Sequence, residues 1–289
     1  MANKSSKAKY LTAKENNSLK EKLDAAKEIM KSCHFCERQC GVNRAAGGRG
    51  WCGVLESRVS SEFLHFGEEA ELIPSHTIFF SGCTFACRYC QNWGISQYPE
   101  RGMYVEPKIL VKLIEKRKSE GAKNVNWVGG EPAPDIAYIL EVLSQCNVNT
   151  PQIWNSNLYL TEESLDILEG VIDIYLPDFK YGNDKCAERL SNVKDYWKIT
   201  KRNHKIISDR NNKIIIRHLV LPNHLECCTF PVLEWISENL NLKNTKVNVM
   251  AQYRPEWRAQ DYREINRELT RDEFERACWF ARDAGLDLC

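Results

Sequence analysis

The chain has 289 residues, of which 43% are hydrophobic and 27% charged, and this composition is that of a globular protein able to bury a sizeable core. Its 40 Lys and Arg residues nearly balance its 39 Asp and Glu residues. The resulting formal charge of +1 disfavours nucleic acid or an anionic membrane as a partner. No apolar run approaches the roughly 20 residues that a transmembrane helix requires.

The 13 cysteines set the expected compartment. The amino terminus shows no apolar stretch of a secretory signal, and no Arg precedes Arg38, which disfavours a mitochondrial transit peptide. Disulfide scaffolds are usually small and secreted, whereas clustered thiols in a reducing compartment more often bind metal. We therefore expect a cytoplasmic, metal-binding protein without a membrane span.

The first part of the chain contains a polar tail and an expected helix. Between residues 15 and 30, Leu and other apolar side chains recur at the spacing of one helix face, so this amphipathic helix should pack on the body of the protein. A Cys- and Gly-rich segment follows it. We therefore divide the chain into a tail and helix at 1–32, a metal-binding knuckle at 33–70, and a β/α region at 71–289.

Beyond residue 70, short apolar stretches alternate with helical ones. The apolar stretches are rich in Ile, Val, Leu and aromatic residues, as buried parallel strands are. Six β/α units indicate an α/β fold, either a partial (β/α)6 barrel or a doubly wound sheet. In both, the active site lies at the carboxyl ends of the strands. The expected strands are His76–Ser81, Asn124–Gly129, Gln152–Ser156, Ile172–Pro177, Lys213–Leu221 and Lys246–Gln252, and the expected helices begin near Pro107 or span about 135–146, 161–169, 231–239 and 270–284.

A cysteine motif directly follows the first of these strands. Cys83, Cys87 and Cys90 have C-x3-C-x2-C spacing on one loop. Three thiolates on one loop can bind three irons of a cubane cluster and leave the fourth iron open to a substrate. A zinc site that takes a distant fourth ligand is the alternative.

Cys-x3-Cys-x-aromatic-Cys at this position resembles the signature of the radical S-adenosylmethionine (SAM) superfamily. The resemblance implies that Cys83, Cys87 and Cys90 hold a [4Fe-4S] cluster whose open iron binds SAM. It further implies reductive cleavage of SAM to a 5′-deoxyadenosyl radical that abstracts hydrogen from a substrate. Tyr89 would then pack beside the adenine.

Two polar segments at the ends of the next strands extend the resemblance. Gly129-Gly130-Glu131-Pro132 is similar to the GGEP segment that binds the SAM amino group, although a simple loop could also contain this tetrapeptide. Glycines permit close backbone approach, and a carboxylate accepts hydrogen bonds from an ammonium group. Asn155-Ser156-Asn157 suits contacts with the ribose or carboxylate of SAM, or else forms a turn or helix cap.

Three charged residues are candidates for the catalytic centre. Asp178 and Lys180 place an acid and a base at the barrel mouth, where activators of glycyl-radical enzymes have a similar Asp-x-Lys. Arg217 lies in an apolar strand, where a charge is costly unless it is used or paired. By the family analogy Arg217 binds the SAM carboxylate, and pairing with Asp173 or Asp178 is the alternative.

A second cysteine motif precedes the first. Cys33, Cys36, Cys40 and Cys52 have the spacing of a closed metal site, since tetrahedral zinc and a fully ligated cubane both require four thiolates. Spacing does not separate an iron–sulfur cluster from zinc. We expect the other six cysteines, at 146, 186, 227, 228, 278 and 289, to be core or surface thiols. Glu68-Glu69, ahead of the first strand, is either an active-site group or a solvated carboxylate pair.

The two motifs and the segments around the strands resemble the PflX-type branch, relatives of pyruvate formate-lyase activating enzyme, over about residues 33–285. We therefore expect a radical SAM enzyme that uses a flavodoxin- or ferredoxin-like electron donor and acts on a glycyl-radical-type protein or a peptide. A small-metabolite substrate, a non-catalytic iron–sulfur carrier and a zinc-stabilised interaction module are the alternatives. A carrier would have no need of a SAM pocket.

Overall fold

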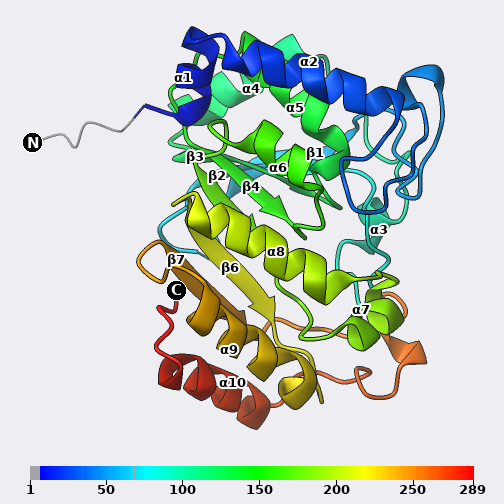
Figure 1. Ribbon diagram of the computed structural model, residues 1–289, viewed down its shortest axis with the longest axis vertical. Coiled ribbons are helices and arrows are strands. Elements are labelled where there is room, and N and C mark those ends of the chain that lie inside the picture. The colour runs from blue at the N-terminus through cyan, green and yellow to red at the C-terminus, as the bar shows by residue number, and fades with distance from the viewer. Residues whose placement is uncertain (1–6, 68) are drawn as a thin grey trace, which may run out of the picture.

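The computed structural model describes residues 7–67 and 69–289 (Figure 1). The expected tail at residues 1–6 and one half of the Glu68-Glu69 pair, Glu68, lie outside the described residues. The described chain forms a seven-stranded sheet in which the order β1 to β7 follows the sequence. The strands are β1 (Val59–His65), β2 (Ser75–Phe80), β3 (Asn124–Gly129), β4 (Gln152–Ser156), β5 (Ile174–Pro177), β6 (Lys213–Leu219) and β7 (Thr245–Met250).

The order of the strands decides between the two expected architectures. Strands β2 to β7 are parallel and each pairs with the next one along the chain. A doubly wound sheet would reverse its strand order at a switch point, so the sequential order confirms the partial (β/α)6 barrel. All six predicted strands are present, and their carboxyl ends lie on one side of the sheet.

The sheet also has an antiparallel edge strand that the sequence analysis missed. Strand β1 pairs with β2 through contacts that run from Val59 opposite Phe80 to His65 opposite Ser75. After the buried Val59, its residues are half-buried or exposed and include Ser and Glu, so it lacks the continuous apolar run of the central strands. An edge strand needs only one buried face, which explains the weak signal.

Two helices replace the single one predicted at the amino-terminal end. Helix α1 (Lys9–Glu15) ends just before Asn17, whose φ of 67° lies in the left-handed region, and α2 (Ser18–Lys31) begins directly after it. Helix α2 buries Leu19, Leu23, Ala26 and Ile29 as expected, and it packs on α5 (Ile136–Gln145). Both amino-terminal helices lie at the end of the molecule opposite α9 and α10 (Figure 1).

The remaining helices connect and cover the strands. Helices α7 and α8 between β5 and β6 were not predicted, although both bury apolar residues on one face. The helices that connect and cover the strands are α3 (Trp93–Ser96), α4 (Pro107–Ser119), α6 (Glu162–Leu168), α7 (Asp184–Ser191), α8 (Tyr196–Asp209), α9 (Phe230–Asn239) and α10 (Arg271–Asp283). The chain also forms the 3-10 turns η1 (Arg44–Ala46), η2 (Ala133–Asp135) and η4 (Ala259–Asp261) and the π-helical turn η3 (Leu225–Thr229).

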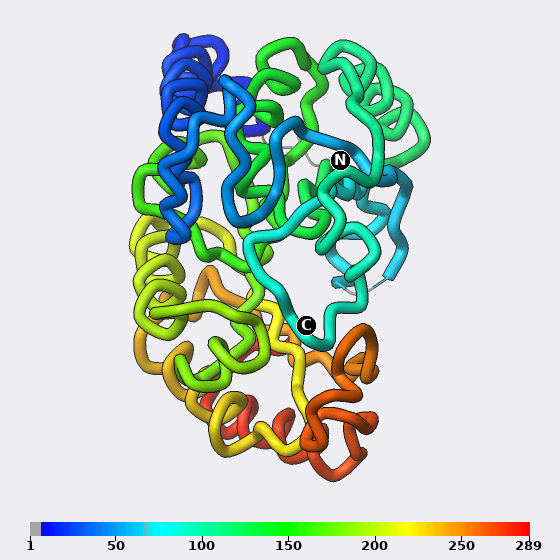
Figure 2. The backbone as a smooth tube through the Cα atoms, turned by 90° about the vertical axis from the view of Figure 1, so that its right-hand side faces the viewer, coloured from blue at the N-terminus to red at the C-terminus, as the bar shows by residue number. Residues whose placement is uncertain are grey.

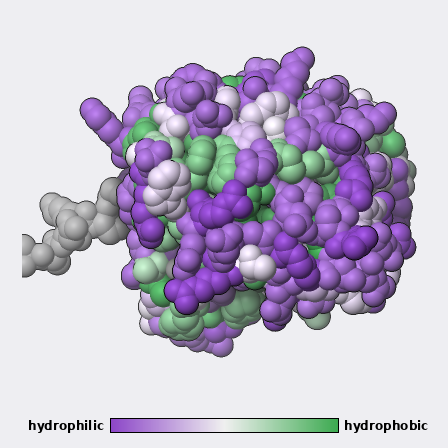
Figure 3. Space-filling view, turned by 90° about the horizontal axis from the view of Figure 1, so that it is seen from below, coloured by the Kyte–Doolittle hydropathy of each residue, from purple (hydrophilic) through white to green (hydrophobic). Residues whose placement is uncertain are grey.

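The loops that carry both cysteine motifs lie on the same side of the molecule. The loop after α2 and the long loop after β2 both face the viewer in Figure 2. The face at the α10 end is mostly hydrophilic, with smaller hydrophobic areas between the polar residues (Figure 3). Among the described residues, none of the helices combines the length and the apolar composition needed to cross a bilayer.

Candidate active site

A cavity lies at the carboxyl ends of the parallel strands, where both expected architectures would place an active site. Every strand from β2 to β7, or the loop that follows it, contributes to its wall. The structure therefore brings together the predicted residues of the first cysteine motif and of the later polar segments. Its wall includes Cys83, Cys87, Tyr89, Cys90, Gly129, Gly130, Glu131, Asn155, Ser156, Asn157, Asp178, Lys180, Arg217 and Gln252.

The two glycines after β3 permit close packing of the chain on itself. A Cβ at Gly129, whose φ is 142°, would lie 2.3 Å from backbone atoms of Phe80. A Cβ at Gly130 would lie 2.0 Å from the carbonyl oxygen of Gly82, next to Cys83. Side chains at these positions would thus displace the start of the cysteine loop, which gives the glycines a role in positioning that loop.

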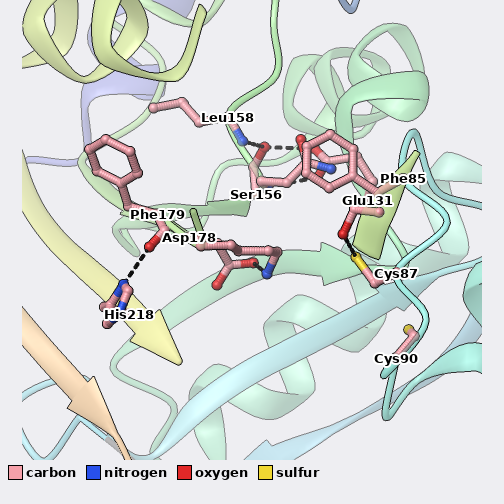
Figure 4. Close-up of polar contacts among 12 residues, drawn as sticks. Phe85, Cys87, Cys90, Glu131, Ser156, Leu158, Asp178, Phe179 and His218 are labelled. Atoms are coloured by element: carbon pink, nitrogen blue, oxygen red, sulfur yellow. Dashed lines mark hydrogen bonds and ion pairs between the residues drawn. The ribbon is translucent and has the colours of Figure 1, made fainter. Parts of the chain in front are cut away.

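The Glu131 carboxylate joins the end of β3 to the end of β4. It accepts hydrogen bonds from Ser156 Oγ at 2.6 Å, Asn157 N at 2.8 Å and Ala133 N at 3.2 Å (Figure 4). Burial raises the pKa of Glu131 to about 7, although these hydrogen bonds act in the opposite direction. Glu131 is therefore a buried group whose protonation changes near neutral pH.

The Asn155-Ser156-Asn157 segment divides into residues with different surroundings. Ser156 Oγ accepts from Leu158 N at 3.0 Å and Asn157 Oδ1 accepts from Tyr159 N at 3.0 Å, so both side chains form the turns that were one alternative. Asn157 Nδ2 also donates to Thr84 Oγ1 in the cysteine loop. Asn155 lines the cavity, and its side chain has no hydrogen bond within the described part of the chain.

The three cysteines of the loop are half-buried and form a donor set suited to a metal cluster. Burial raises the pKa of Cys87 to about 11, and it raises the pKa of Cys83 and Cys90 in the same direction. Buried thiols with raised pKa values stay protonated unless a nearby cation compensates the thiolate charge. Three soft sulfur ligands on one loop therefore fit an iron–sulfur cluster, whose irons would provide that charge.

A chain of hydrogen bonds connects the cavity wall to the sulfur of Cys87. Ser191 Oγ, at the end of α7, lies 2.9 Å from Cys87 Sγ and 2.5 Å from Tyr181 Oη. Tyr181 Oη lies 2.7 Å from Tyr89 Oη. Because a thiolate only accepts, Ser191 donates to Cys87, and the two tyrosines donate in sequence towards Ser191. No local pattern pointed to Ser191, since it lies 104 positions from Cys87.

Two aromatic neighbours, Tyr253 and Tyr181, constrain the side chain of Tyr89. Its ring lies 5.7 Å from that of Tyr253, centre to centre, at an angle of 57°. Tyr89 is buried and lines the cavity. Packing from Tyr253 and the hydrogen bond to Tyr181 therefore fix the ring.

Asp178 and Lys180 form an ion pair at the cavity wall. Lys180 Nζ lies 2.7 Å from Asp178 Oδ2 (Figure 4). Burial by itself lowers the pKa of Lys180, but the Asp178 carboxylate and the nearby Cys87 outweigh it and raise this pKa above its ordinary value. The Lys180 ammonium group therefore remains charged at neutral pH beside the cysteine loop.

Arg217 has a partner that differs from both expected ones. Its Nε and Nη2 donate to the two carboxylate oxygens of Glu69 at 2.8 and 2.7 Å, and Asn248 Nδ2 donates to the same carboxylate at 2.9 Å. Glu69 is buried, so the expectation of a solvated carboxylate is wrong for this residue. Burial by itself raises the pKa of Glu69, but Arg217 overrides it and lowers this pKa.

The expected partners of Arg217 are engaged elsewhere. Asp173 accepts hydrogen bonds from the backbone nitrogens of Gln152 and Lys9, and Asp178 pairs with Lys180. The segment between β1 and β2 brings Glu69 to β6, although the two residues are 148 positions apart. Such a contact cannot be read from local spacing.

The second cysteine motif lies against the first. Cys33, Cys36, Cys40 and Cys52 line a separate cavity of about 10 Å³. Arg38, within this motif, donates from Nε to the backbone oxygen of Thr84 at 3.1 Å. Thr84 follows Cys83, so the knuckle directly supports the cysteine loop of the large cavity.

Comparisons of the sequence with known proteins identify a family and a relative of this chain. The sequence profile of the Radical SAM superfamily matches residues 77–236, more than half of the chain. The uncharacterized protein MJ0674 of Methanocaldococcus jannaschii is 52% identical over 278 residues, which cover 94% of this chain and 80% of that protein.

Solved structures show the same fold at low sequence identity. Streptococcus suis SuiB bound to S-adenosylmethionine is 16% identical, with a TM-score of 0.52 over 72% of this chain and 47% of SuiB. A radical SAM methyltransferase from Sphaerobacter thermophilus is 11% identical, with a TM-score of 0.52 over 75% of this chain and 66% of the other. The chain thus spans about half the length of SuiB, and these likenesses concern the fold alone.

The buried carboxylate of Glu131 should make stability depend on pH. Its pKa of about 7 in the folded chain exceeds the ordinary 4.5, so its contribution to stability is present below pH 4.5 and is lost as the pH rises towards 7. Glu131→Gln should remove a decline in the free energy of unfolding of about 1.4 kcal/mol per pH unit in this window. Anaerobic urea unfolding at several pH values measures it. The exposed Glu188→Gln serves as the control, and equal pH slopes for wild type and Glu131→Gln would contradict the prediction.

Proposed function

The chain belongs to the radical SAM superfamily, and on this premise we propose that it abstracts hydrogen from a peptide or protein substrate. Membership implies an enzyme that uses a [4Fe-4S] cluster and SAM. The observation that carries the proposal is the cavity at the strand ends, whose wall combines three half-buried cysteine sulfurs with polar groups from the following strands. A carrier of iron–sulfur clusters would not need those further groups.

Cys83, Cys87 and Cys90 are the residues that would hold the cluster. When bound, the cluster and SAM supply an electron and a 5′-deoxyadenosyl radical for hydrogen abstraction. Ser191 stabilises the Cys87 thiolate by its hydrogen bond, and Gly130 lets the end of β3 pack against the start of the cysteine loop. The chain's own contribution is thus to position the three sulfurs and to place one side of them in the cavity.

The two ion pairs in the wall suit a ligand that carries both signs of charge. Lys180 with Asp178, and Arg217 with Glu69, present cations that the protein already balances. The amino-acid end of SAM is a zwitterion, so neighbouring donors and acceptors match it better than one isolated charge would. We assign Asp178, Lys180 and Arg217 to binding and orientation, and Asn155 to a direct polar contact with SAM.

A structural neighbour and the sequence motifs support the substrate class. SuiB, which has a similar fold, has been solved bound to its precursor peptide SuiA, and this supports a peptide substrate. The PflX-like motifs point in the same direction, towards a peptide or a glycyl-radical-type protein, and a small metabolite is the alternative. A flavodoxin- or ferredoxin-like protein in the cytoplasm would supply the electron.

For the second cysteine motif we propose an auxiliary iron–sulfur cluster rather than zinc. Tetrahedral zinc with bonds of about 2.3 Å places thiolates about 3.8 Å apart, whereas a cubane separates them by a shell of iron and sulfide. Within the described residues, no three sulfurs of this motif lie within 4.8 Å of one another.

Loss of a cluster ligand should abolish SAM cleavage. Cys87→Ala should reduce 5′-deoxyadenosine formation to background under dithionite, because two sulfurs cannot hold the cluster in the cavity. Liquid chromatography of anaerobic reactions measures the product. Cys278→Ala in α10, distant from both motifs, should retain wild-type formation, and continued product formation by Cys87→Ala would exclude Cys87 as a ligand.

A substitution within the second cysteine motif distinguishes an iron–sulfur cluster from zinc at that site. Cys36→Ala should lower the iron content of the reconstituted protein from about eight to about four atoms per chain, while the other cluster remains. Elemental analysis of iron and zinc measures it. A wild-type protein with about four irons, together with a zinc ion that Cys36→Ala loses, would instead support zinc at this motif.

The hydrogen bond from Ser191 to Cys87 should raise the reduction potential of the cluster. Hydrogen bonds to cysteine sulfur favour the reduced cluster, so Ser191→Ala should make its reduction potential more negative by on the order of 50 mV. Tyr181→Phe keeps the Ser191 donor and removes only its neighbour, so its shift should be smaller and of the same sign. Redox titration followed by electron paramagnetic resonance measures both, and an unchanged potential in Ser191→Ala would contradict the assignment.

A further inference from the structure

A third group of ligand-type side chains lies outside both cysteine motifs. The ligand atoms of Cys186, His224 and Cys227 all lie within 4.8 Å of one another. Cys186 belongs to α7, whereas His224 directly precedes η3 and Cys227 lies within it, after β6. Both cysteines were expected to be core or surface thiols, because they are 41 positions apart and show no local spacing.

One asparagine and one glycine hold the two segments together. Asn183 Oδ1 accepts from Cys186 N at 2.8 Å, and its Nδ2 donates to the backbone oxygen of Cys227 at 2.7 Å. A Cβ at Gly182 would lie 2.8 Å from that same oxygen. The close approach of η3 to α7 is therefore built into the chain, and it brings the three side chains together.

The protonation of His224 suits a metal ligand. Its Nδ1 lies 2.7 Å from the backbone oxygen of Pro222, which only accepts, so Nδ1 carries the proton. The Nε2 lone pair is then available, and the side chain contacts Cys186. Histidines that bind metals usually donate their other ring nitrogen to a carbonyl or carboxylate in this way, which fixes the ring orientation.

The sulfur spacing matches a single ion better than a cluster or a disulfide. Cys186 Sγ and Cys227 Sγ are 3.9 Å apart. Two thiolates on a tetrahedral zinc ion are separated by about 3.8 Å, whereas a disulfide bond measures about 2.05 Å. His224 is buried, Cys186 is half-buried and Cys227 is exposed, so the group opens to solvent on one side.

We propose that Cys186, His224 and Cys227 bind one Zn²⁺ ion, with water as the fourth ligand. Two thiolates and one imidazole form a donor set that suits zinc, and three protein ligands leave one position for a further group. This site is independent of the radical chemistry, because it uses none of the residues that line the cavity at the strand ends.

The proposed ion would stabilise the helix that supports the cysteine loop. Cys186 lies in the first turn of α7, and the carbonyl oxygens of Leu190 and Ser191 at its other end accept from Arg88 N and Ala86 N at 2.8 and 3.0 Å. Zinc at the beginning of α7 would join this helix to η3. The zinc site and the Cys87 hydrogen bond thus lie on the same short helix.

Zinc content of the full-length protein tests the proposal. After both cysteine motifs are reconstituted with iron under anaerobic, reducing conditions, the wild type is dialysed with Zn²⁺ and then against buffer, and bound zinc is measured by mass spectrometry. Cys227→Ser should lower bound zinc by about one equivalent per chain relative to wild type. This exposed cysteine should tolerate Ser, and His224→Gln is the second variant. Cys289→Ser, at another exposed cysteine, should retain the zinc.

Substitution by Co²⁺ identifies the ligands. The wild type should show the visible absorption of tetrahedral Co²⁺ together with thiolate charge-transfer bands, and Cys227→Ser and His224→Gln should lose them while circular dichroism remains unchanged. Equal zinc content in wild type and in both variants would overturn the proposal. A wild-type mass lower by about 2 Da without bound zinc, which indicates a Cys186–Cys227 disulfide, would also overturn it.

Discussion

The site depends on the free-energy cost of partly burying three cysteine thiolates at the carboxyl ends of the parallel strands. Burial raises the pKa values of all three thiols, so the thiolate form requires compensating positive charge. A metal cluster supplies such charge, whereas a protein without one would hold three neutral thiols in a cavity. The packing around the loop is best understood as the means by which the chain holds these sulfurs in place.

Several separate contacts hold that loop. Gly130 permits the end of β3 to pack on its first residues, Arg38 from the second motif donates to Thr84, and Ser191 at the end of α7 donates to Cys87. These contacts come from three different parts of the chain. A loop fixed from three directions presents its ligands in one arrangement, so little ordering remains to be done when a cluster binds.

The wall of the cavity also contains charged side chains that are paired with groups of opposite charge. The Lys180–Asp178 and Arg217–Glu69 pairs keep cations in partly buried positions that would be costly for isolated charges. Glu131 is different, because its partners among residues 7–67 and 69–289 are hydrogen-bond donors and not cations, and burial raises its pKa to about 7. The cavity therefore contains fixed charges together with one carboxyl group that titrates near neutral pH.

The sequence by itself determined the six parallel strands and both cysteine motifs. Strands buried on both faces form continuous apolar runs, and ligands on one loop have a spacing that depends only on the local chain. Only the tertiary structure decided the ion pair between Glu69 and Arg217. The same holds for the hydrogen bond from Ser191 to Cys87 and for the proximity of Cys186 to Cys227. Each of these pairs joins segments far apart in the chain, and such contacts arise from the packing of strands and helices, which local periodicity and spacing do not encode.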